Sequence, residues 1–329
     1  MAEALVKVSH LRKYFPIQGG VFSRQIGSVK AVDDVSFEIN SGEIFGLVGE
    51  SGCGKSTVGR TILNLLEPNG GKVEFNGRTL FDVDAKIKIA DSDMRLLRRD
   101  MQIIFQDPFA SLDPRMTIGT IVSEGLLAHK LATPAEAMRR SEELLQLCGI
   151  SLENINRYPH EFSGGQRQRI SIARALAFGP RFVIGDEPIA ALDVSIQAQI
   201  LTLMQDLKEK MGLTYLFISH DLGVVRYFCD RLAVMYLGSF VETGTSEQLF
   251  NNPAHPYAQA LLSAMPSLDS ESTAERIILK GSVPSPANAP SGCKFHTRCP
   301  QAMPRCSEAA PVMKEIETGH FAACHLLDK

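Results

Sequence analysis

Residues 49–57 constrain the fold more than any other stretch of this sequence. They read Gly-Glu-Ser-Gly-Cys-Gly-Lys-Ser-Thr and fit the pattern G-x-x-x-x-G-K-[ST]. Residues 31–48 before them read as two short strands separated by a turn, and residues 57–66 after them carry apolar side chains at helical spacing. A strand, a glycine-rich loop and a helix in this order open an α/β unit whose loop is suited to bind phosphate.

Each position of this loop has a physical role in binding a nucleoside triphosphate. The glycines permit the turns that point successive backbone N–H groups inward, and the N-terminus of the following helix adds its positive dipole. We expect the Lys55 ammonium to reach the β and γ phosphates and the Ser56 hydroxyl to coordinate Mg²⁺. The other binding positions of the loop are Gly49, Ser51, Gly52, Cys53, Gly54 and Thr57.

A second apolar strand supplies the carboxylates that a metal-bound phosphate requires. The sequence Arg-Phe-Val-Ile-Gly-Asp-Glu ends at Asp186 and Glu187. Asp186 is expected to hold Mg²⁺, and Glu187 is expected to polarise the attacking water as a general base. Two acids after an apolar run can also merely cap the next helix, but the phosphate loop upstream favours the catalytic interpretation.

Composition and charge exclude several classes of protein. The chain has 329 residues, of which 44% are hydrophobic and 22% are charged, so about two domains with sizeable cores are expected. Its net charge of −3 gives no strong field for nucleic acid, which we therefore do not expect as a partner. We find no apolar run near the roughly 18 residues of a membrane span and no signal peptide, so we expect a cytoplasmic protein.

The order of strand and helix patterns predicts an α/β fold with a mainly parallel sheet. Residues 116–149 carry two amphipathic helical patterns without a strand between them, which indicates an inserted helical subdomain. A Pro/Gly/Ser-rich linker at 281–292 leads into a short tail. We divide the chain into a first domain at 1–250, with the helical subdomain at about 110–165, and a C-terminal extension at 251–329.

Residues 163–166, Ser-Gly-Gly-Gln, open a predicted helix and resemble the signature motif of the ATP-binding cassette (ABC) ATPases. Three further motifs of that family follow the order of the chain: Gln106 in the Q-loop, Ala191-Leu192-Asp193 in the D-loop, and His220 as the switch histidine. The resemblance covers at least residues 1–250. It implies a P-loop NTPase core of the RecA-like type, with antiparallel β strands at its N-terminus.

The resemblance also implies how these residues act. Ser163, Gly164, Gly165 and Gln166 would close over the γ-phosphate held by another subunit, so that two nucleotides lie between two chains. His220 would contact the γ-phosphate and the attacking water. The resemblance makes Gln106 both a catalytic residue and part of the Mg²⁺ site, which it would couple to a docked partner. Phe15 aligns with the residue that stacks on adenine in this family, and Tyr14 is the alternative.

Two later segments are similar to one branch of the family. Residues 255–262, His-Pro-Tyr-Ala-Gln-Ala-Leu-Leu, resemble the start of the C-terminal extension of dipeptide and oligopeptide importer ATPases, and residues 16–28 are typical of the second of their two ATPases. This implies ATP hydrolysis that powers peptide import at the cytoplasmic face of the bacterial inner membrane. The implied partners are a second, homologous ATPase in a heterodimer, two permeases and an extracytoplasmic peptide-binding protein. A nickel or glutathione importer, or a soluble ABC ATPase, is the alternative.

Four cysteines of the tail are spaced C-x₅-C-x₆-C-x₁₇-C. This is not the paired spacing of a zinc ribbon, and the Cys-Pro step at 299–300 is typical of ferredoxin-type ligation. Together with the resemblance it predicts a [4Fe–4S] cluster, with zinc or no metal as alternatives. The expected ligands are Cys293, Cys299, Cys306 and Cys324.

Overall fold

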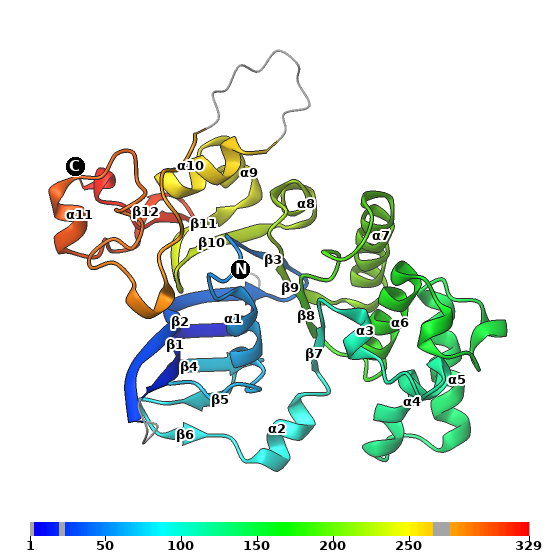
Figure 1. The fold of residues 1–329 in the computed structure, drawn as a ribbon. Helices are drawn as coiled ribbons and strands as arrows, with labels where there is room; N and C mark the ends of the chain where they lie inside the picture. Colours follow the sequence, from blue (N-terminus) through cyan, green and yellow to red (C-terminus); the bar gives the residue numbers. More distant parts are fainter. Residues whose placement is uncertain (1–2, 20–23, 266–276, 329) are drawn as a thin grey trace. The chain divides into compact units, whose positions relative to one another are not determined.

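The computed structural model describes residues 3–19, 24–265 and 277–328 (Figure 1). The chain divides into two compact units. The first combines residues 1–89 with residues 219–329, so it is built from both ends of the sequence. The second is continuous and spans residues 90–218.

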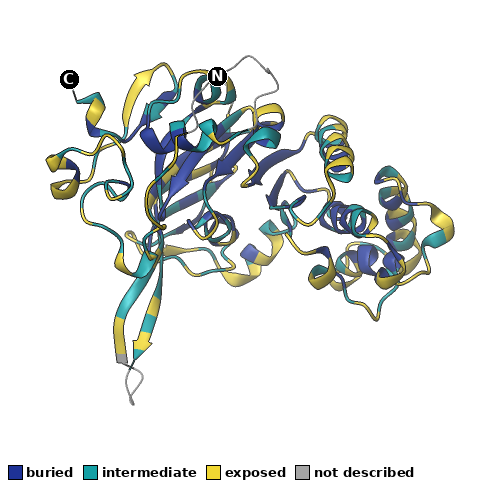
Figure 2. Cartoon of the chain, turned by 45° about the horizontal axis from the view of Figure 1, so that its top comes forward, coloured by how far each residue is buried: buried dark blue, intermediate teal, exposed yellow. Residues whose placement is uncertain are grey.

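One sheet of the first unit is antiparallel and follows the order β2-β1-β4-β5-β6. Its long hairpin of β1 and β2 has an inner half with alternating buried residues and an outer half that is mainly half-buried (Figure 2). The buried side chains of β1, such as Leu5 and Val8, are at most 3% exposed. The strands are β1 (Ala4–Gly19), β2 (Arg24–Asn40), β4 (Gly70–Phe75), β5 (Arg78–Asp82) and β6 (Ile87–Lys88).

The other sheet of the first unit is mixed. Strand β3 pairs in parallel with β10, where Phe45 faces Arg231, and β10 pairs antiparallel with β11. A C-terminal hairpin extends this sheet, because β13 pairs with β11 and with β12. The strands are β3 (Ile44–Val48), β10 (Arg231–Tyr236), β11 (Ser239–Thr245), β12 (Lys314–Glu317) and β13 (His320–Ala322), and the helices are α1 (Lys55–Ile62), α8 (Leu222–Phe228), α9 (Ser246–Asn251), α10 (Pro256–Ser263) and α11 (Pro304–Glu308).

The second unit holds three parallel strands in the order β9-β8-β7. All residues of β8 and β9 are buried, which explains why both strands read as continuous apolar runs. The strands are β7 (Met101–Ile104), β8 (Phe182–Asp186) and β9 (Thr214–Ile218), and the helices are α2 (Asp91–Leu97), α3 (Pro108–Ser111), α4 (Ile118–Ala128), α5 (Pro134–Leu147), α6 (Gly164–Leu176) and α7 (Val194–Met211).

The predicted fold class is confirmed. Parallel strands alternate with helices, the N-terminal strands form an antiparallel sheet, and α4 and α5 occupy the stretch whose spacing predicted two helices. The sequence did not indicate β4 and β5, nor the hairpin of β12 and β13. Among the described residues, no helix combines the length and the apolar character that crossing a bilayer requires.

Candidate nucleotide site

The phosphate loop has a backbone that only glycine allows at two positions. Gly54 has a φ of 112°, and a Cβ atom there would lie 2.0 Å from the carbonyl oxygen of Ala31. At Gly49, with a φ of 151°, a Cβ atom would lie 2.2 Å from the carbonyl oxygen of Met235. Both distances are far below any van der Waals contact, so side chains at these positions would distort the loop. Because these side chains are missing, the backbone of the loop can pass close to neighbouring carbonyl groups.

Helix α1 begins directly after this loop at Lys55. Its N-cap is Gly54, which offers no side-chain acceptor to the first N–H groups of the helix. The Lys55 ammonium is buried and donates hydrogen bonds to the carbonyl oxygens of Gly49, at 2.8 Å, and Glu50, at 3.2 Å. A buried cation and the start of a helix at one loop suit a nucleoside triphosphate, as the spacing predicted. The Cys53 thiol is buried, and this burial raises its pKa, which favours a packing role for its side chain.

The second unit brings together two predicted catalytic residues. The amide nitrogen Nε2 of Gln106 donates a hydrogen bond to Oε2 of Glu187 at 2.9 Å. Asp186 ends β8 and is 1% exposed, while Glu187 follows with a φ of 50°, a left-handed conformation that is uncommon for a residue with a side chain. Such strain concentrates at functional sites. The arrangement holds the Glu187 carboxylate in one orientation just beyond a buried aspartate.

The predicted signature motif forms the start of α6. Ser163 is its N-cap, its hydroxyl accepts the N–H of Gln166 at 3.3 Å, and Oε1 of Gln166 accepts the N–H of Ser163 at 3.0 Å. At Gly165 a Cβ atom would lie 2.5 Å from a methyl group of Ile196, which forces a small residue there. Ser163 and Gln166 are exposed, so this helix start faces solvent within its unit.

His220 lies in the first unit and is exposed. The residue before it, Ser219, donates its N–H to the carbonyl oxygen of Leu47 at 3.2 Å, which places this turn beside β3, the strand that leads to the phosphate loop. Asp221 then caps α8 by accepting the N–H of Val224 at 3.2 Å. The turn that carries His220 is therefore fixed on both sides.

The two candidate adenine-stacking residues differ in their contacts. The Tyr14 hydroxyl donates to Oδ1 of Asp33 at 2.6 Å, and burial together with this hydrogen bond raises the pKa of Tyr14 to about 12. The Phe15 ring has the ammonium of Lys13 4.9 Å from its centroid. The adenine-stacking role stays a prediction, with Phe15 first and Tyr14 as the alternative.

The four tail cysteines are all free thiols. Burial, followed by the proximity of Cys306, Cys324 and Cys299, raises the pKa of Cys293 to about 11, so the four side chains lie within electrostatic reach of one another. Over the described ranges, however, no three or more His, Cys, Asp or Glu side chains form a group that could hold a metal ion. The donor chemistry fits a metal, but the arrangement of the thiols does not, and the predicted cluster or zinc site has no support.

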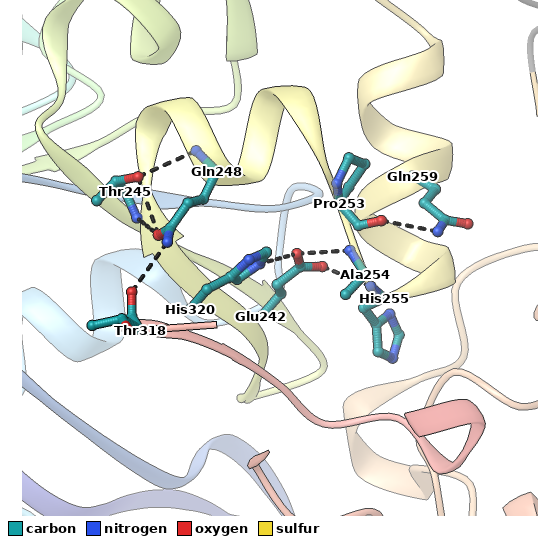
Figure 3. Close-up of polar contacts among 9 residues, drawn as sticks. All are labelled: Glu242, Thr245, Gln248, Pro253, Ala254, His255, Gln259, Thr318 and His320. Atoms are coloured by element: carbon teal, nitrogen blue, oxygen red, sulfur yellow. Dashed lines mark hydrogen bonds and ion pairs between the residues drawn. The ribbon is translucent and has the colours of Figure 1, made fainter. Parts of the chain in front are cut away.

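Sequence reasoning missed the polar residues that fix the tail. Glu242 on β11 is fully buried, and Figure 3 shows it between the tail and the start of α10. Its carboxylate accepts the N–H groups of Ala254 at 2.9 Å and His255 at 2.7 Å, and it bonds Nε2 of His320 on β13 at 2.7 Å. The only signal in the sequence was a charged residue directly after the apolar pair Phe240 and Val241.

The predicted site residues thus fall into two sets. The first unit contains the phosphate loop, Phe15 and His220, and the second contains Gln106, the signature motif, Asp186 and Glu187. Within the second unit, Gln106 and Glu187 are in direct contact. Within the first, Ser219 places the His220 turn beside the strand that precedes the loop.

Comparison with known families gives two matches. Residues 32–190 match the model of the ABC transporter family, and residues 241–306 match the C-terminal region of oligopeptide/dipeptide transporters. The first match contains the phosphate loop, Gln106, the signature motif and the two acids. The second contains Glu242, the His-Pro-Tyr element and three of the four tail cysteines.

Curated relatives resemble the chain over nearly its whole length. The oligopeptide transport ATP-binding protein AppF of Bacillus subtilis is 51% identical, with 98% of each chain covered. The dipeptide transport ATP-binding protein DppF of Haemophilus influenzae is 45% identical, with 98% of this chain and 97% of that protein covered. A putative peptide import ATP-binding protein of Brucella ovis is 52% identical, with 92% and 94% covered.

Solved structures with this fold are ATP-binding cassettes. The cassette MJ0796, solved as a dimer in a post-hydrolysis state with ADP and Pi, is 28% identical, with a TM-score of 0.63, and 73% of this chain and 98% of that chain are covered. The protein cbiO1 of Clostridium perfringens, part of the ABC transporter complex cbiONQ, is 26% identical with the same TM-score, and 76% and 92% are covered.

Proposed function

The chain belongs to the family of ATP-binding subunits of ABC transporters for oligopeptides and dipeptides, and from this premise we propose that it hydrolyses ATP to power peptide import through membrane permeases. The observation that carries the proposal is the phosphate loop, whose glycines leave room that any Cβ atom would fill. The Lys55 ammonium and the start of α1 supply the positive charge that a triphosphate requires.

We further propose a division of labour among the site residues. Lys55 would bind the β and γ phosphates, and the residues that would hold Mg²⁺ are Ser56, Asp186 and Gln106. When bound, Mg²⁺ would supply positive charge to the phosphate oxygens. Glu187 takes the proton of the attacking water, and its hydrogen bond to Gln106 at 2.9 Å supports this role because it orients the carboxylate. His220 contacts the γ-phosphate.

A second ATPase subunit is needed to complete this site. The helix start at Ser163, Gly164 and Gly165 is suited to bind an anion on a chain with one phosphate loop, and Ser163 is exposed in its own unit. We propose that it covers a nucleotide bound by a homologous partner cassette, in a heterodimer. The dimeric state reported for the similar cassette MJ0796 supports this arrangement.

The surface for the permease is proposed to lie in the second unit. A groove of about 630 Å³ begins three residues after Gln106 and is lined by Phe109, Arg115 and Arg174, among others. The Phe109 side chain is 62% exposed, and the Arg167 guanidinium lies 3.8 Å from its ring centroid. An apolar side chain held at the edge of such a groove suits a permease segment at the cytoplasmic face of the membrane. An extracytoplasmic peptide-binding protein would complete the importer.

The Glu187→Gln variant tests the catalytic assignment. We expect turnover in the assembled transporter to fall by roughly 10²–10⁴-fold, because the variant removes the general base, while ATP binding is retained. ATP turnover and equilibrium nucleotide binding are the two measurements. The matched control is Glu143→Gln, which changes an exposed glutamate on α5. Unchanged turnover in Glu187→Gln would remove this residue from the mechanism.

Two measurements test the partner and the tail. Specific ATPase activity should rise with subunit concentration. A strictly concentration-independent activity in an isolated monomer would contradict the proposed pairing of two ATPase subunits around the nucleotides.

For the tail, a [4Fe–4S] cluster stays a prediction, with zinc as its alternative. Iron, sulfide and zinc analysis of anaerobically purified protein decides it, and protein without any of the three leaves the cysteines as thiols.

A further inference from the structure

One tail residue reaches into the phosphate loop. The guanidinium of Arg298 donates from Nη1 to Oε2 of Glu50 at 2.8 Å and from Nη2 to Oε1 at 3.1 Å. The Arg298 side chain is 8% exposed and that of Glu50 is 28% exposed, so this two-pronged ion pair is largely removed from water. Bidentate pairs of this kind fix geometry as well as charge. Glu50 is the second residue of the loop, directly after Gly49.

The backbone of the same loop residue is held by a second element. The N–H of Glu50 donates to the hydroxyl of Tyr257 on α10 at 3.0 Å. Tyr257 is fully buried and packs against Phe295 of the tail, with ring centroids 5.3 Å apart, and against Tyr236, at 4.7 Å. Both the main chain and the side chain of Glu50 are therefore anchored by the C-terminal part of the protein.

The same tail segment also reaches the strand next to the candidate adenine position. The ammonium of Lys294 donates to Oδ2 of Asp33 at 2.8 Å and to the carbonyl oxygen of Leu237 at 2.9 Å. Asp33 in turn accepts the hydroxyl of Tyr14 at 2.6 Å. Burial alone would raise the pKa of Asp33, but the hydrogen bonds from Lys294 and Tyr14 outweigh it and hold the pKa below its usual value. Asp33 is thus an anion paired with the tail.

We propose that residues 294–298, the tail clamp, position the phosphate loop for ATP, and that Arg298 is the positioning residue that acts through Glu50. This inference rests on the proposed nucleotide site. A carboxylate one residue into a loop that binds a triphosphate would repel the ligand if it were unpaired. Arg298 neutralises that charge and fixes the direction in which the carboxylate points. The clamp therefore favours the loop geometry that ATP requires before ATP arrives.

The Arg298→Gln variant of the full chain tests the clamp by ATP·Mg titration. We expect affinity to fall by about 10-fold, because the variant leaves the Glu50 carboxylate without its ion pair and free to repel the phosphates. In the assembled transporter the KM for ATP should rise by a similar factor with kcat nearly unchanged, because the clamp acts on binding. Amide hydrogen exchange within 49–57 should also become faster. Arg305→Gln is the matched control, because Arg305 is a tail arginine that is 60% exposed and pairs with Asp328 away from the loop.

A second substitution separates positioning from simple folding. Glu50→Gln introduced into Arg298→Gln should restore several-fold of the lost affinity, because it removes the unpaired carboxylate, whereas a damaged tail fold would not be rescued this way. Arg298→Lys keeps the positive charge but lacks the two nitrogens that bond both carboxylate oxygens of Glu50. Its affinity for ATP should therefore lie between those of the wild type and Arg298→Gln. The clamp is refuted by unchanged affinity and unchanged exchange in Arg298→Gln. Full ATP binding by Lys55→Ala would instead refute the proposed nucleotide site itself.

Discussion

The phosphate loop and the tail are both short and polar, yet they are held in opposite ways. The loop takes most of its backbone path from its own glycines, such as Gly54, whose backbone angles other residues avoid, and the tail holds it at Glu50. The tail takes its shape from distant partners, with Lys294 bonded to Asp33 and Arg298 bonded to Glu50. The conformation of a segment can be predicted from residue spacing when residues within the segment determine it. It cannot be predicted in this way when contacts with residues far away in the sequence determine it.

The largest expected effect concerns the loop. Lys55→Ala should weaken ATP binding by roughly 10²–10⁴-fold, since the ammonium would make two charge-assisted contacts to phosphates, each worth about 1.5–3 kcal/mol. Thermal unfolding should change far less than binding, because the glycine backbone still defines the loop. Isothermal titration with ATP·Mg and a melting curve provide the two values. Lys7→Ala, an exposed lysine of β1, is the control, and equal losses in both lysine variants would contradict a specific role.

Loss of a buried contact of the tail should have the opposite result, with a large loss of stability. Glu242→Gln leaves the N–H groups of Ala254 and His255 and the ring of His320 with a poorer acceptor in a fully buried site. We expect the free energy of unfolding to fall by about 3–5 kcal/mol, as for the loss of a buried, hydrogen-bonded charge. Urea unfolding measures it.

An exposed glutamate provides the comparison for Glu242. The ion pair of Arg139 with Glu143 is about 60% exposed on both sides, and Glu143→Gln should change the free energy of unfolding by only about 0.3–0.5 kcal/mol. If Glu242→Gln were as mild as this control, the tail would not depend on its buried carboxylate.

The smallest expected effect is the pH dependence of stability that His255 causes. His255 caps helix α10, which contacts both the phosphate loop and the tail through Tyr257. Burial lowers the pKa of His255 to about 4, and its Nδ1 accepts the N–H of Tyr257 at 3.0 Å, so the folded protein keeps this ring neutral. The unfolded chain takes up a proton near pH 6.5, so stability is full above that pH and falls between 6.5 and about 4, by about 3 kcal/mol for this group.

Urea midpoints between pH 7 and pH 4.5 measure this dependence. His255→Asn should flatten the curve in that window, because it removes the proton that only the unfolded state binds. His10→Asn, which changes a histidine that is 71% exposed, is the exposed-histidine control. An unaltered slope in His255→Asn would show that other groups cause the acid sensitivity.

The sequence predicted most of what depends on neighbouring residues. The helix after the loop was predicted over 57–66 and lies at Lys55–Ile62, so its existence followed from the local pattern but its bounds did not. The strand ending at Asp186 and the helix capped by Ser163 also follow from local patterns. The contact between Gln106 and Glu187 was not derivable, because 81 residues separate them, although the family resemblance placed both in one site. Arg298 was missed because nothing in an isolated tail arginine shows that its partner lies 248 positions earlier.

The metal prediction for the tail shows the limit of spacing arguments. Four cysteines at suggestive intervals do come within electrostatic reach of one another, as Cys293 demonstrates. Ligand geometry requires more than proximity, and within the described part of the chain the thiols do not form a metal-binding group. The interval between cysteines restricts how far apart they lie, but it does not set where their sulfur atoms point.

The first unit is made from both ends of the sequence, and this has a consequence for its biosynthesis. Strand β3 ends at Val48, but its parallel neighbour β10 begins at Arg231. At about 5–20 residues per second, a ribosome needs roughly 10–40 s to make the intervening stretch. During that time the continuous second unit is translated in full, so it can fold before β10 is made. The close approach of Gly49 to the Met235 carbonyl therefore forms only after residue 235 has been added, although the nucleotide loop is among the first segments made.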